Sequence, residues 1–516
     1  MNFSFLLNIL CAFLWVFSVQ AKEIRYAIPG EVSSLDPAVV TDIESMTVSD
    51  TIFDNLIQLK PGSFEFEEGL AESWEVNARM DEYTFKIRKG VSFHDGSPLN
   101  SDAVIFSFLR QHDPKHEAHK YGKWHYWRGL GMNTLVKKVF KKDNHTVVFQ
   151  LSRPEATFLA NLTMPFSSIV SPKAVRKYKD KFGQNPVGSG PFKFSKWETG
   201  RSINVNKNVK YWGKKAIVNG VQFRVLKRTE GFQELLAKNV DIVPWFTSEG
   251  LDLVKQEQKS LKVLKGVGAN ICYIAFNTNK KPFNNVDFRK ALTLGLNVGK
   301  IIKEAYRGTG QRASTILAPS IMGFNENIKP YKYNLAEAKK SLIKSGIEEG
   351  FSFNFYTIPI PRSYIPNPDK VTKIIVESWE ALGLKPNVVK LPWKEYLEKR
   401  RYGIHDVTLG GWVSDNGDPD NTIYTLLHGN NAVPPATNPS FWSHKGVNKL
   451  LQEAKAIPWP QERIAKYKKA QEIIHSEYPV IPIAHTNLFV SMSKKIKGFV
   501  VDSMDKRRFE LLDLKD

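Results

Sequence analysis

The second half of the chain alternates between helix-like and strand-like segments, and this alternation constrains the fold more than any other feature. Apolar residues recur every three to four positions in three long segments: 286–297, 334–344 and 368–382. Shorter apolar runs between and after them predict strands at 352–357, 386–390 and 406–409. A helix at 459–476 and a strand at 480–483 follow. Such alternation predicts an α/β domain with a largely parallel sheet.

The first half of the chain has a different pattern. Apolar and polar residues alternate in 83–89, which predicts a half-buried strand, and residues 135–151 have the pattern of a hairpin. Ser101 or Asp102 is expected to cap a helix. Because 516 residues are too many for one ordinary core, we expect two or three domains.

The N-terminus has the pattern of a secretory signal peptide. Residues 3–19 are almost wholly apolar, and Val19 and Ala21 occupy the two positions that determine cleavage. We therefore expect a signal peptide at 1–21 and a mature, exported chain that starts near Lys22. No Lys or Arg precedes the apolar run, so an uncleaved anchor is the alternative. No later segment has the run of about 20 apolar residues that a membrane helix needs.

The composition limits the kinds of partner and of cross-link. If Cys11 leaves with the signal peptide, Cys272 alone remains and no intrachain disulfide can form. Lys and Arg number 73 against 52 Asp and Glu, a formal net charge of +21, which suggests nucleic acid as one partner. The basic residues are scattered, however, and no zinc-finger spacing or RNA-binding motif is present. A general basic surface without specific nucleic acid is the favoured interpretation.

Residues 410–421 form the most unusual polar segment. After an apolar run come three aspartates, two asparagines, a glycine and a proline, which are typical of a turn. Trp412 is a costly side chain to place in a turn unless something packs on it. The segment is either a plain polar turn or the floor of a ligand site that presents a carboxylate to a cation.

The chain lacks the motifs of catalysis. Residues 112–125 contain four histidines, and a helix could place His112, His116 and His119 on one face. An exposed His-rich segment is the alternative to a metal site, and Pro114 would interrupt a helix. No histidine belongs to a nucleophile elbow, a zinc-protease helix or a Cys/His zinc pattern. We therefore expect neither an enzyme nor a bound cofactor or metal.

Several segments together resemble one family, the extracytoplasmic solute-binding proteins (bacterial family 5) of ABC importers that carry peptides. The segments that carry the resemblance are 69–76, 83–96, 102–108, 185–192, 211–213, 276–277 and 287–292. The resemblance extends from about residue 24 to 514. Within the family, the dipeptide-binding branch is the most similar, through 361–364, 411–421 and 497–502.

The resemblance implies an α/β fold of two lobes, the type II periplasmic binding protein of the large peptide-binding class. Such a fold has a hinge, a discontinuous first lobe and an inserted extra domain. Lobe 1 is then expected to comprise residues 22–55, 188–270 and 490–516. Residues 56–187 are expected to form the inserted domain, and 271–489 lobe 2.

The resemblance also implies a ligand site. In the dipeptide binders, an aspartate of this loop takes the peptide's α-ammonium and an upstream arginine takes its α-carboxylate; here the matching residues are Asp415 and Arg362. An extended dipeptide is a zwitterion with ends about 6 Å apart, so one anion and one cation can measure its length. The planar fork of arginine suits a carboxylate. The other residues expected at the site are Gly411, Trp412, Tyr364, Trp393, Thr41 and Asp42. Asp418 and Asp420 are expected to fold the turn around Pro419 instead.

The function expected from these features is capture of a small peptide in the periplasm and its delivery to ABC permease subunits in the inner membrane. The protein would act as a monomer, and closure of its lobes would be the working step. Two alternatives stay open. The same fold could bind glutathione, haem or a metal chelate, or the basic chain could bind nucleic acid in the cell envelope.

Overall fold

The computed structural model describes residues 22–457 and 460–515. The predicted signal peptide, residues 1–21, lies outside the described residues. Within the described part, no helix combines the length and apolar character needed to cross a membrane.

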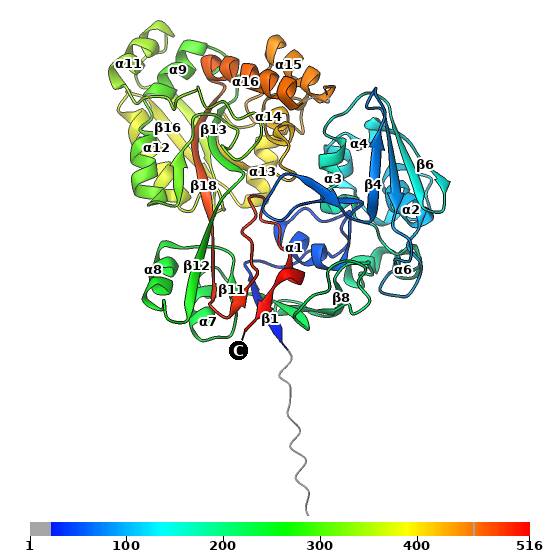
Figure 1. The fold of residues 1–516 in the computed structure, drawn as a ribbon. Helices are drawn as coiled ribbons and strands as arrows, with labels where there is room; N and C mark the ends of the chain where they lie inside the picture. The colour runs from blue at the N-terminus through cyan, green and yellow to red at the C-terminus, as the bar shows by residue number, and fades with distance from the viewer. Residues whose placement is uncertain (1–21, 458–459, 516) are drawn as a thin grey trace, which may run out of the picture.

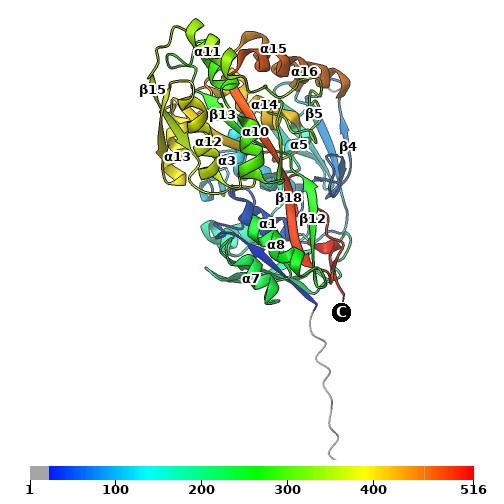
Figure 2. The same ribbon diagram turned by 90° about the vertical axis from the view of Figure 1, so that its left-hand side faces the viewer.

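One long sheet joins two lobes (Figure 1). Its strands follow the order β16-β15-β17-β13-β18-β11-β1-β10-β9-β8, and β12 and β14 also pair with β18. The link is β18 (Val480–Ser493), whose first residues pair with β13 (Asn270–Phe276) and whose last residues pair with β11 (Ile242–Val243). We call the half that contains β13–β17 lobe 2, and the half that contains β1 and β8–β12 lobe 1. Figure 2 shows β18 and β12 (Leu261–Val267) running together between the lobes.

Lobe 2 contains the alternating helices and strands that the sequence predicts. Its other strands are β14 (Gly310–Arg312), β15 (Ser352–Thr357), β16 (Lys385–Lys390) and β17 (Val407–Val413). Its main helices are α9 (Val286–Leu294), α11 (Leu335–Lys344), α12 (Pro368–Glu380), α13 (Trp393–Arg401), α14 (Pro419–Leu427), α15 (Lys445–Lys455) and α16 (Pro460–Glu477). The side chains of Asn285, Asn334 and Asn367 cap α9, α11 and α12 by accepting backbone hydrogen bonds. The helices begin at these residues because an asparagine cap satisfies donors that the first turn leaves unpaired.

The sheet of lobe 2 is mixed, whereas the sequence pattern predicted a largely parallel one. The strand β15 pairs in parallel with β16 and β17, but β13 runs antiparallel to both β17 and β18. The prediction is wrong for β13 and β18 because these two strands connect the lobes and run in opposite directions. The alternation of helix and strand along the chain carries no information about that connection.

Lobe 1 is smaller and is built around β1 (Glu23–Ile28). This strand pairs in parallel with β10 (Gly220–Val225) on one side and with β11 on the other. The sheet continues antiparallel through β9 (Ser202–Lys207) and β8 (Phe192–Glu198). The helices of this lobe are α1 (Ile43–Ile52), α7 (Gly231–Leu236) and α8 (Ser248–Gln256).

A third unit, on the right in Figure 1, contains an antiparallel sheet of four strands. Their order is β4 (Ala71–Val76), β5 (Glu82–Ile87), β7 (Thr146–Leu151) and β6 (Val136–Asp143). The sheet packs against α2 (Ser101–His112), whose cap is Asn100 and neither of the two residues predicted. The short helices α3 (His125–Gly129) and α5 (Phe158–Asn161) carry residues that face lobe 2. We call this unit the insert domain.

The histidines of residues 112–125 are engaged separately. Because α2 ends at His112, this residue and His116 do not share a helix face. The ring of His112 packs against Trp127, and that of His116 against Phe106. In the described ranges, no group of three or more His, Cys, Asp and Glu side chains could hold a metal ion.

The domain boundaries stay a prediction. Side chains pack across the boundary between the range 56–187 and lobe 1. Phe106 and Val170, from that range, belong to the same buried apolar cluster as Ile24 and Val221 of lobe 1. The insert domain and lobe 1 therefore share part of their core.

Candidate ligand-binding cleft

The carboxyl ends of the parallel strands in lobe 2 point toward lobe 1. The first residue of β13, Asn270, lies next to the crossing from lobe 1 and pairs with Val413, the last residue of β17. Because β15 and β16 run parallel to β17, all three strands end at this edge. Ligands of α/β proteins bind at such edges. The segments that follow the three strands carry Arg362, Trp393 and Asp415.

Asp415 lies in a short loop between β17 and α14 and is held by hydrogen bonds from two directions. The amide of Asn421 donates to one carboxylate oxygen (3.3 Å), and the hydroxyl of Tyr126 donates to the other (3.3 Å). The backbone N–H of Asp415 donates in turn to the side-chain oxygen of Asn421 (3.0 Å). Tyr126 belongs to α3 of the insert domain, so the carboxylate joins two units of the molecule.

The environment of Asp415 disfavours its charge. Burial raises the pKa of Asp415 to about 6, although hydrogen bonds from Asn421 and Tyr126 and the charge of Lys506 oppose that shift. No Lys or Arg forms an ion pair with Asp415 among residues 22–457 and 460–515. The carboxylate would therefore gain stability from a cation that binds beside it.

The other two aspartates of the loop have structural tasks. Asp418 caps α14 by accepting from the backbone N–H of Asp420 (2.9 Å), with Pro419 as the first helical residue. The guanidinium of Arg463 donates to both oxygens of Asp418 (2.9 and 3.0 Å). Asp420 is buried, and Lys455 lies 3.3 Å from its carboxylate. These contacts agree with the prediction that Asp418 and Asp420 fold the turn.

Arg362 is held in place by stacking. Its guanidinium carbon lies 4.6 Å from the centre of the Trp393 ring, and Trp393 itself stacks on Tyr396 (5.4 Å). Its backbone exchanges two hydrogen bonds of 3.0 Å with Ile365, which close the loop after β15. The side chain forms no ion pair or hydrogen bond with any residue that the structure describes. It is a half-buried cation without a direct ion pair in the described residues, although its charge opposes the rise in the pKa of Glu44.

Gly411, Trp412 and Tyr364 form one packed group. The residues 410–413, which the sequence assigned to a turn, are the last residues of β17 and pair with β13. A Cβ atom on Gly411 would lie 2.1 Å from the ring of Tyr364, so only glycine fits there. Tyr364 is buried, and the ring N–H of Trp412 donates to Asn421 (3.1 Å). Trp412 thus supports the residue that holds Asp415.

Thr41 and Asp42 lie in lobe 1, before α1. Asp42 is the cap of that helix, because its carboxylate accepts from the backbone N–H of Ser45 (2.8 Å) and from the hydroxyl of Ser33 (2.6 Å). Thr41 is exposed. The side chain of Asp42 is therefore engaged, and the backbone of this segment is what remains available to a ligand.

Sequence reasoning missed the contacts that the insert domain makes with this loop. Besides Tyr126, the side chain of Asn161 in α5 accepts a hydrogen bond from Asn416 (2.9 Å). Both Asn161 and Asn416 are buried. No local pattern marks Tyr126 or Asn161, because each lies more than 250 positions before its partner.

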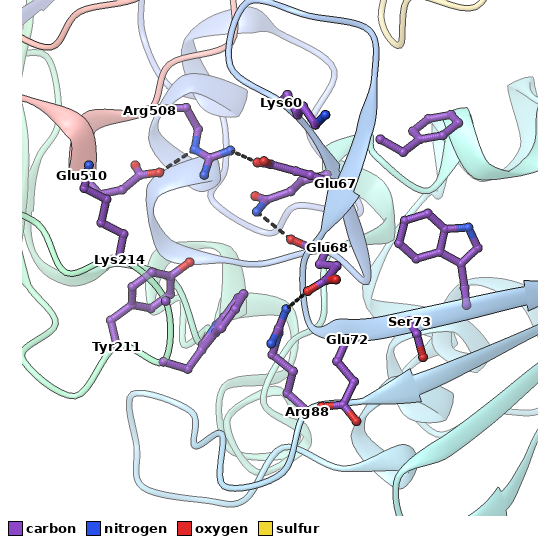
Figure 3. Close-up of a pocket in the computed structure, with 15 residues that line it drawn as sticks. Lys60, Glu67, Glu68, Glu72, Ser73, Arg88, Tyr211, Lys214, Arg508 and Glu510 are labelled. Carbon is purple, nitrogen blue, oxygen red and sulfur yellow. Dashed lines mark hydrogen bonds and ion pairs between the residues drawn. The ribbon is translucent and has the colours of Figure 1, made fainter.

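A separate pocket of about 730 Å³ lies between the hairpin of β2 (Ile57–Leu59) and β3 (Phe66–Glu68) and the Tyr211–Trp212 segment (Figure 3). Figure 3 shows Arg508 between Glu67 and Glu510, and Arg88 beside Glu68. Its charges are thus largely paired within the protein. None of the predicted ligand residues lines it.

The chain is similar over almost its whole length to known proteins that bind peptides or haem. It is 35% identical over 512 residues to the dipeptide-binding protein of Escherichia coli (strain K12), which covers 96% of this chain and 95% of that protein. It is 34% identical over 479 residues to the heme-binding protein A of Haemophilus influenzae, covering 90% and 87%. The solved structure of the ABC transporter-associated periplasmic binding protein DppA from Helicobacter pylori, in complex with the peptide STSA, superimposes with a TM-score of 0.85. The identity there is 34%, with 96% of this chain and 98% of that chain covered.

The family model of the bacterial extracellular solute-binding proteins, family 5, matches residues 65–433. That range contains the insert domain and every residue from Arg362 to Asp415 at the edge of lobe 2. The two-lobed α/β fold and the match agree with each other. The chain belongs to the family 5 bacterial extracellular solute-binding proteins.

Proposed function

We propose that this protein is the substrate-binding component of an ABC importer and that it captures dipeptides and other short peptides. The observation that carries the proposal is the pair of unpaired opposite charges, Asp415 and Arg362, on loops that follow the adjacent strands β17 and β15. An anion at one end and a cation at the other match a zwitterion whose ends lie about 6 Å apart. The printed names of several relatives, among them the dipeptide-binding protein of Escherichia coli, support the same ligand class.

The roles follow from the contacts. Asp415, fixed by Asn421 and Tyr126, pairs with the peptide's α-ammonium. Arg362, stacked on Trp393, pairs with its α-carboxylate through two parallel N–H donors. Trp412 and Tyr364 form the wall beside the peptide backbone. The protein changes no covalent bond. The lobes close over the ligand, and a membrane permease recognises the closed form.

The location and partners belong to the same proposal. Residues 1–21 direct export, the mature protein acts as a monomer in the periplasm, and permease subunits in the inner membrane take the peptide from it. The excess of Lys and Arg aids contact with an anionic membrane face and does not form a nucleic-acid site.

Calorimetry with four ligands tests the proposal: Ala-Ala, N-acetyl-Ala-Ala, Ala-Ala amide and free Ala. We expect micromolar or tighter binding of Ala-Ala, which corresponds to about 8 kcal/mol or more. Either blocked peptide should bind far more weakly, because it leaves one charge buried and unpaired. Equal affinity for the acetylated peptide would contradict the role of Asp415.

Haem is a second candidate ligand, because one relative of 34% identity is a heme-binding protein. A titration followed by haem absorbance, with and without saturating Ala-Ala, separates the two candidates. Haem that binds stoichiometrically and is displaced by the dipeptide would place haem in the same cleft. Peptide binding without any haem signal would remove the second candidate.

A further inference from the structure

The edge of lobe 1 that faces the cleft is built like the edge of lobe 2. In lobe 1, β11 runs antiparallel to β18, with Val243 paired to Ser491 and Ile242 to Met492. Because β18 comes from lobe 2, the end of β11 points back toward lobe 2. The strands β1 and β10 run parallel to β11, so their carboxyl ends lie at the same edge. The carboxyl edges of the two parallel-strand groups therefore face each other.

Each of these two edges carries an arginine that stacks on a tryptophan. In lobe 2, Arg362 follows β15 and stacks on Trp393, which follows the neighbouring strand β16. In lobe 1, Arg228 follows β10 and lies over Trp245, which follows β11 (5.7 Å from the guanidinium carbon to the ring centre). The ring N–H of Trp245 also donates to the backbone carbonyl of Arg228 (3.1 Å). Trp245 thus contacts both the guanidinium and the backbone carbonyl of Arg228.

Apart from stacking on a tryptophan, neither guanidinium has a polar partner among residues 22–457 and 460–515. Arg228, like Arg362, forms no ion pair and no side-chain hydrogen bond with a residue that the structure describes. Burial lowers the pKa of Arg228, and the charge of Arg362 lowers it further, while Glu44 and Asp505 oppose the shift. The charge of Arg362 thus affects Arg228 although the two residues belong to different lobes.

The acidic groups near the two arginines do not fully neutralise them. Asp505 is bonded to Arg507, and Asp42 to Ser33 and Ser45. Glu44 of α1 is half-buried, and burial raises its pKa more than the arginines lower it. Two guanidinium groups are thus opposed by at most one carboxylate, so positive charge is in excess here. A ligand carboxylate between the two guanidinium groups would balance it.

We propose that Arg228 is the lobe 1 counterpart of Arg362, and that the two guanidinium groups grip the terminal carboxylate of the peptide from opposite sides when the lobes are closed. This inference rests on the proposed function and names a residue that specifies the ligand's C-terminal end. It also gives lobe 1 a direct interaction with the ligand charge. The ligand then joins the lobes by bridging two cations that would otherwise repel each other.

The test compares free and amidated Ala-Ala on the wild type and on Arg228→Met. Amidation should weaken binding by the wild type about hundredfold or more. Arg228→Met should weaken binding of Ala-Ala by about tenfold to hundredfold, and the penalty for amidation should shrink by the same factor. The penalty for N-acetylation should not change, because Arg228 is not at the Asp415 end.

Two further variants keep the result interpretable. Arg228→Lys retains the charge but not the fork, so its affinity for Ala-Ala should lie between wild type and Arg228→Met. Lys259→Met removes an exposed cation just before β12, at the end of lobe 1 far from the cleft, and should bind as the wild type does. An unchanged amidation penalty in Arg228→Met would overturn the inference and leave the proposed function intact. A wild type that binds no dipeptide would overturn both.

Discussion

The two charged ends of the cleft are built differently. Asp415 is fixed by hydrogen bonds from Asn421 and from Tyr126 of another domain, and burial raises its pKa. The guanidinium of Arg362 stacks on Trp393 and forms no hydrogen bond or ion pair with a described residue. We therefore expect the acidic end to be the more rigid of the two, whereas the guanidinium at the basic end can turn more easily on its single stacking contact. A rigid anchor saves ordering entropy on binding, and an adjustable one accommodates peptides whose carboxylates lie in different positions.

The strongest test of this difference is Asp415→Asn. The substitution keeps the shape and the contacts with Asn421 but removes the charge, so the peptide ammonium would be buried unpaired. We expect affinity for Ala-Ala to fall by about 3 kcal/mol, roughly a hundredfold or more. Calorimetry measures the affinity, and the melting temperature of the free protein should not fall, because an uncompensated buried charge is removed.

Asp418→Asn is the matched control for that variant. It alters an aspartate of the same loop whose carboxylate is bonded to Arg463. Leaving Arg463 buried without its partner should cost about 3 kcal/mol of stability. The folded protein should still bind Ala-Ala normally. Loss of affinity in Asp418→Asn equal to that in Asp415→Asn would remove the distinction between the two aspartates.

Substitution of Arg362 at the basic end should reduce the affinity for Ala-Ala less than substitution of Asp415 does. For Arg362→Met we expect affinity for Ala-Ala to fall by about 2 kcal/mol, because the cation is held by one stacking contact and the peptide can shift toward water. Arg362→Lys should recover part of this loss, since the charge is kept and the planar fork is not. Calorimetry with Ala-Ala amide completes the test. The amide should bind wild type and Arg362→Met almost equally, and a persistent difference would contradict the assignment.

The pH dependence should come from the acidic end. With a pKa of about 6, Asp415 in the free protein is mostly protonated at pH 5 and cannot pair with the peptide ammonium. Affinity for Ala-Ala should therefore fall about tenfold between pH 7.5 and pH 5, whereas the affinity of Asp415→Asn should be nearly flat.

The folding stability contributed by Asp415 should change with pH in the opposite direction to the affinity. Because the folded-state pKa of Asp415 lies above its ordinary value, the folded protein binds this proton more tightly than the unfolded chain does. The contribution of this group to stability thus increases as pH falls through 6, while affinity decreases. Titration of both quantities separates a titrating site from simple acid unfolding, in which both would decrease together.

The smallest effect is expected at Trp393. Replacement by Leu removes the stacking surface under Arg362 and should cost about 0.5–1 kcal/mol of binding, a few-fold change in affinity. Trp393→Phe should recover part of it, because the phenylalanine ring also offers a face to the cation. A loss as large as that of Arg362→Met would mean that the basic end is as rigid as the acidic end.

Much of the local structure follows from the residues alone. The strand at 352–357 and the helices that start near 286, 334 and 368 are where the sequence pattern predicts them. These elements have strong apolar periodicity and, in the helices, asparagine caps. By contrast, residues 410–413 have the composition of a turn but form the end of β17. Their strand conformation depends on pairing with β13 and on Tyr364, which occupies the space that a side chain on Gly411 would need.

Short motifs spread along the chain are enough to identify the family, and the resemblance to that family singles out Asp415 and Arg362 as the candidate ligand charges. The contacts that hold these two charged side chains depend on the tertiary structure. Tyr126 reaches Asp415 from the insert domain, and in lobe 1 the folded chain places Arg228 over Trp245; no short sequence pattern records either contact. The reason is physical: the pKa of a carboxyl group and the freedom of a guanidinium depend on burial and neighbours, which the folded chain alone supplies.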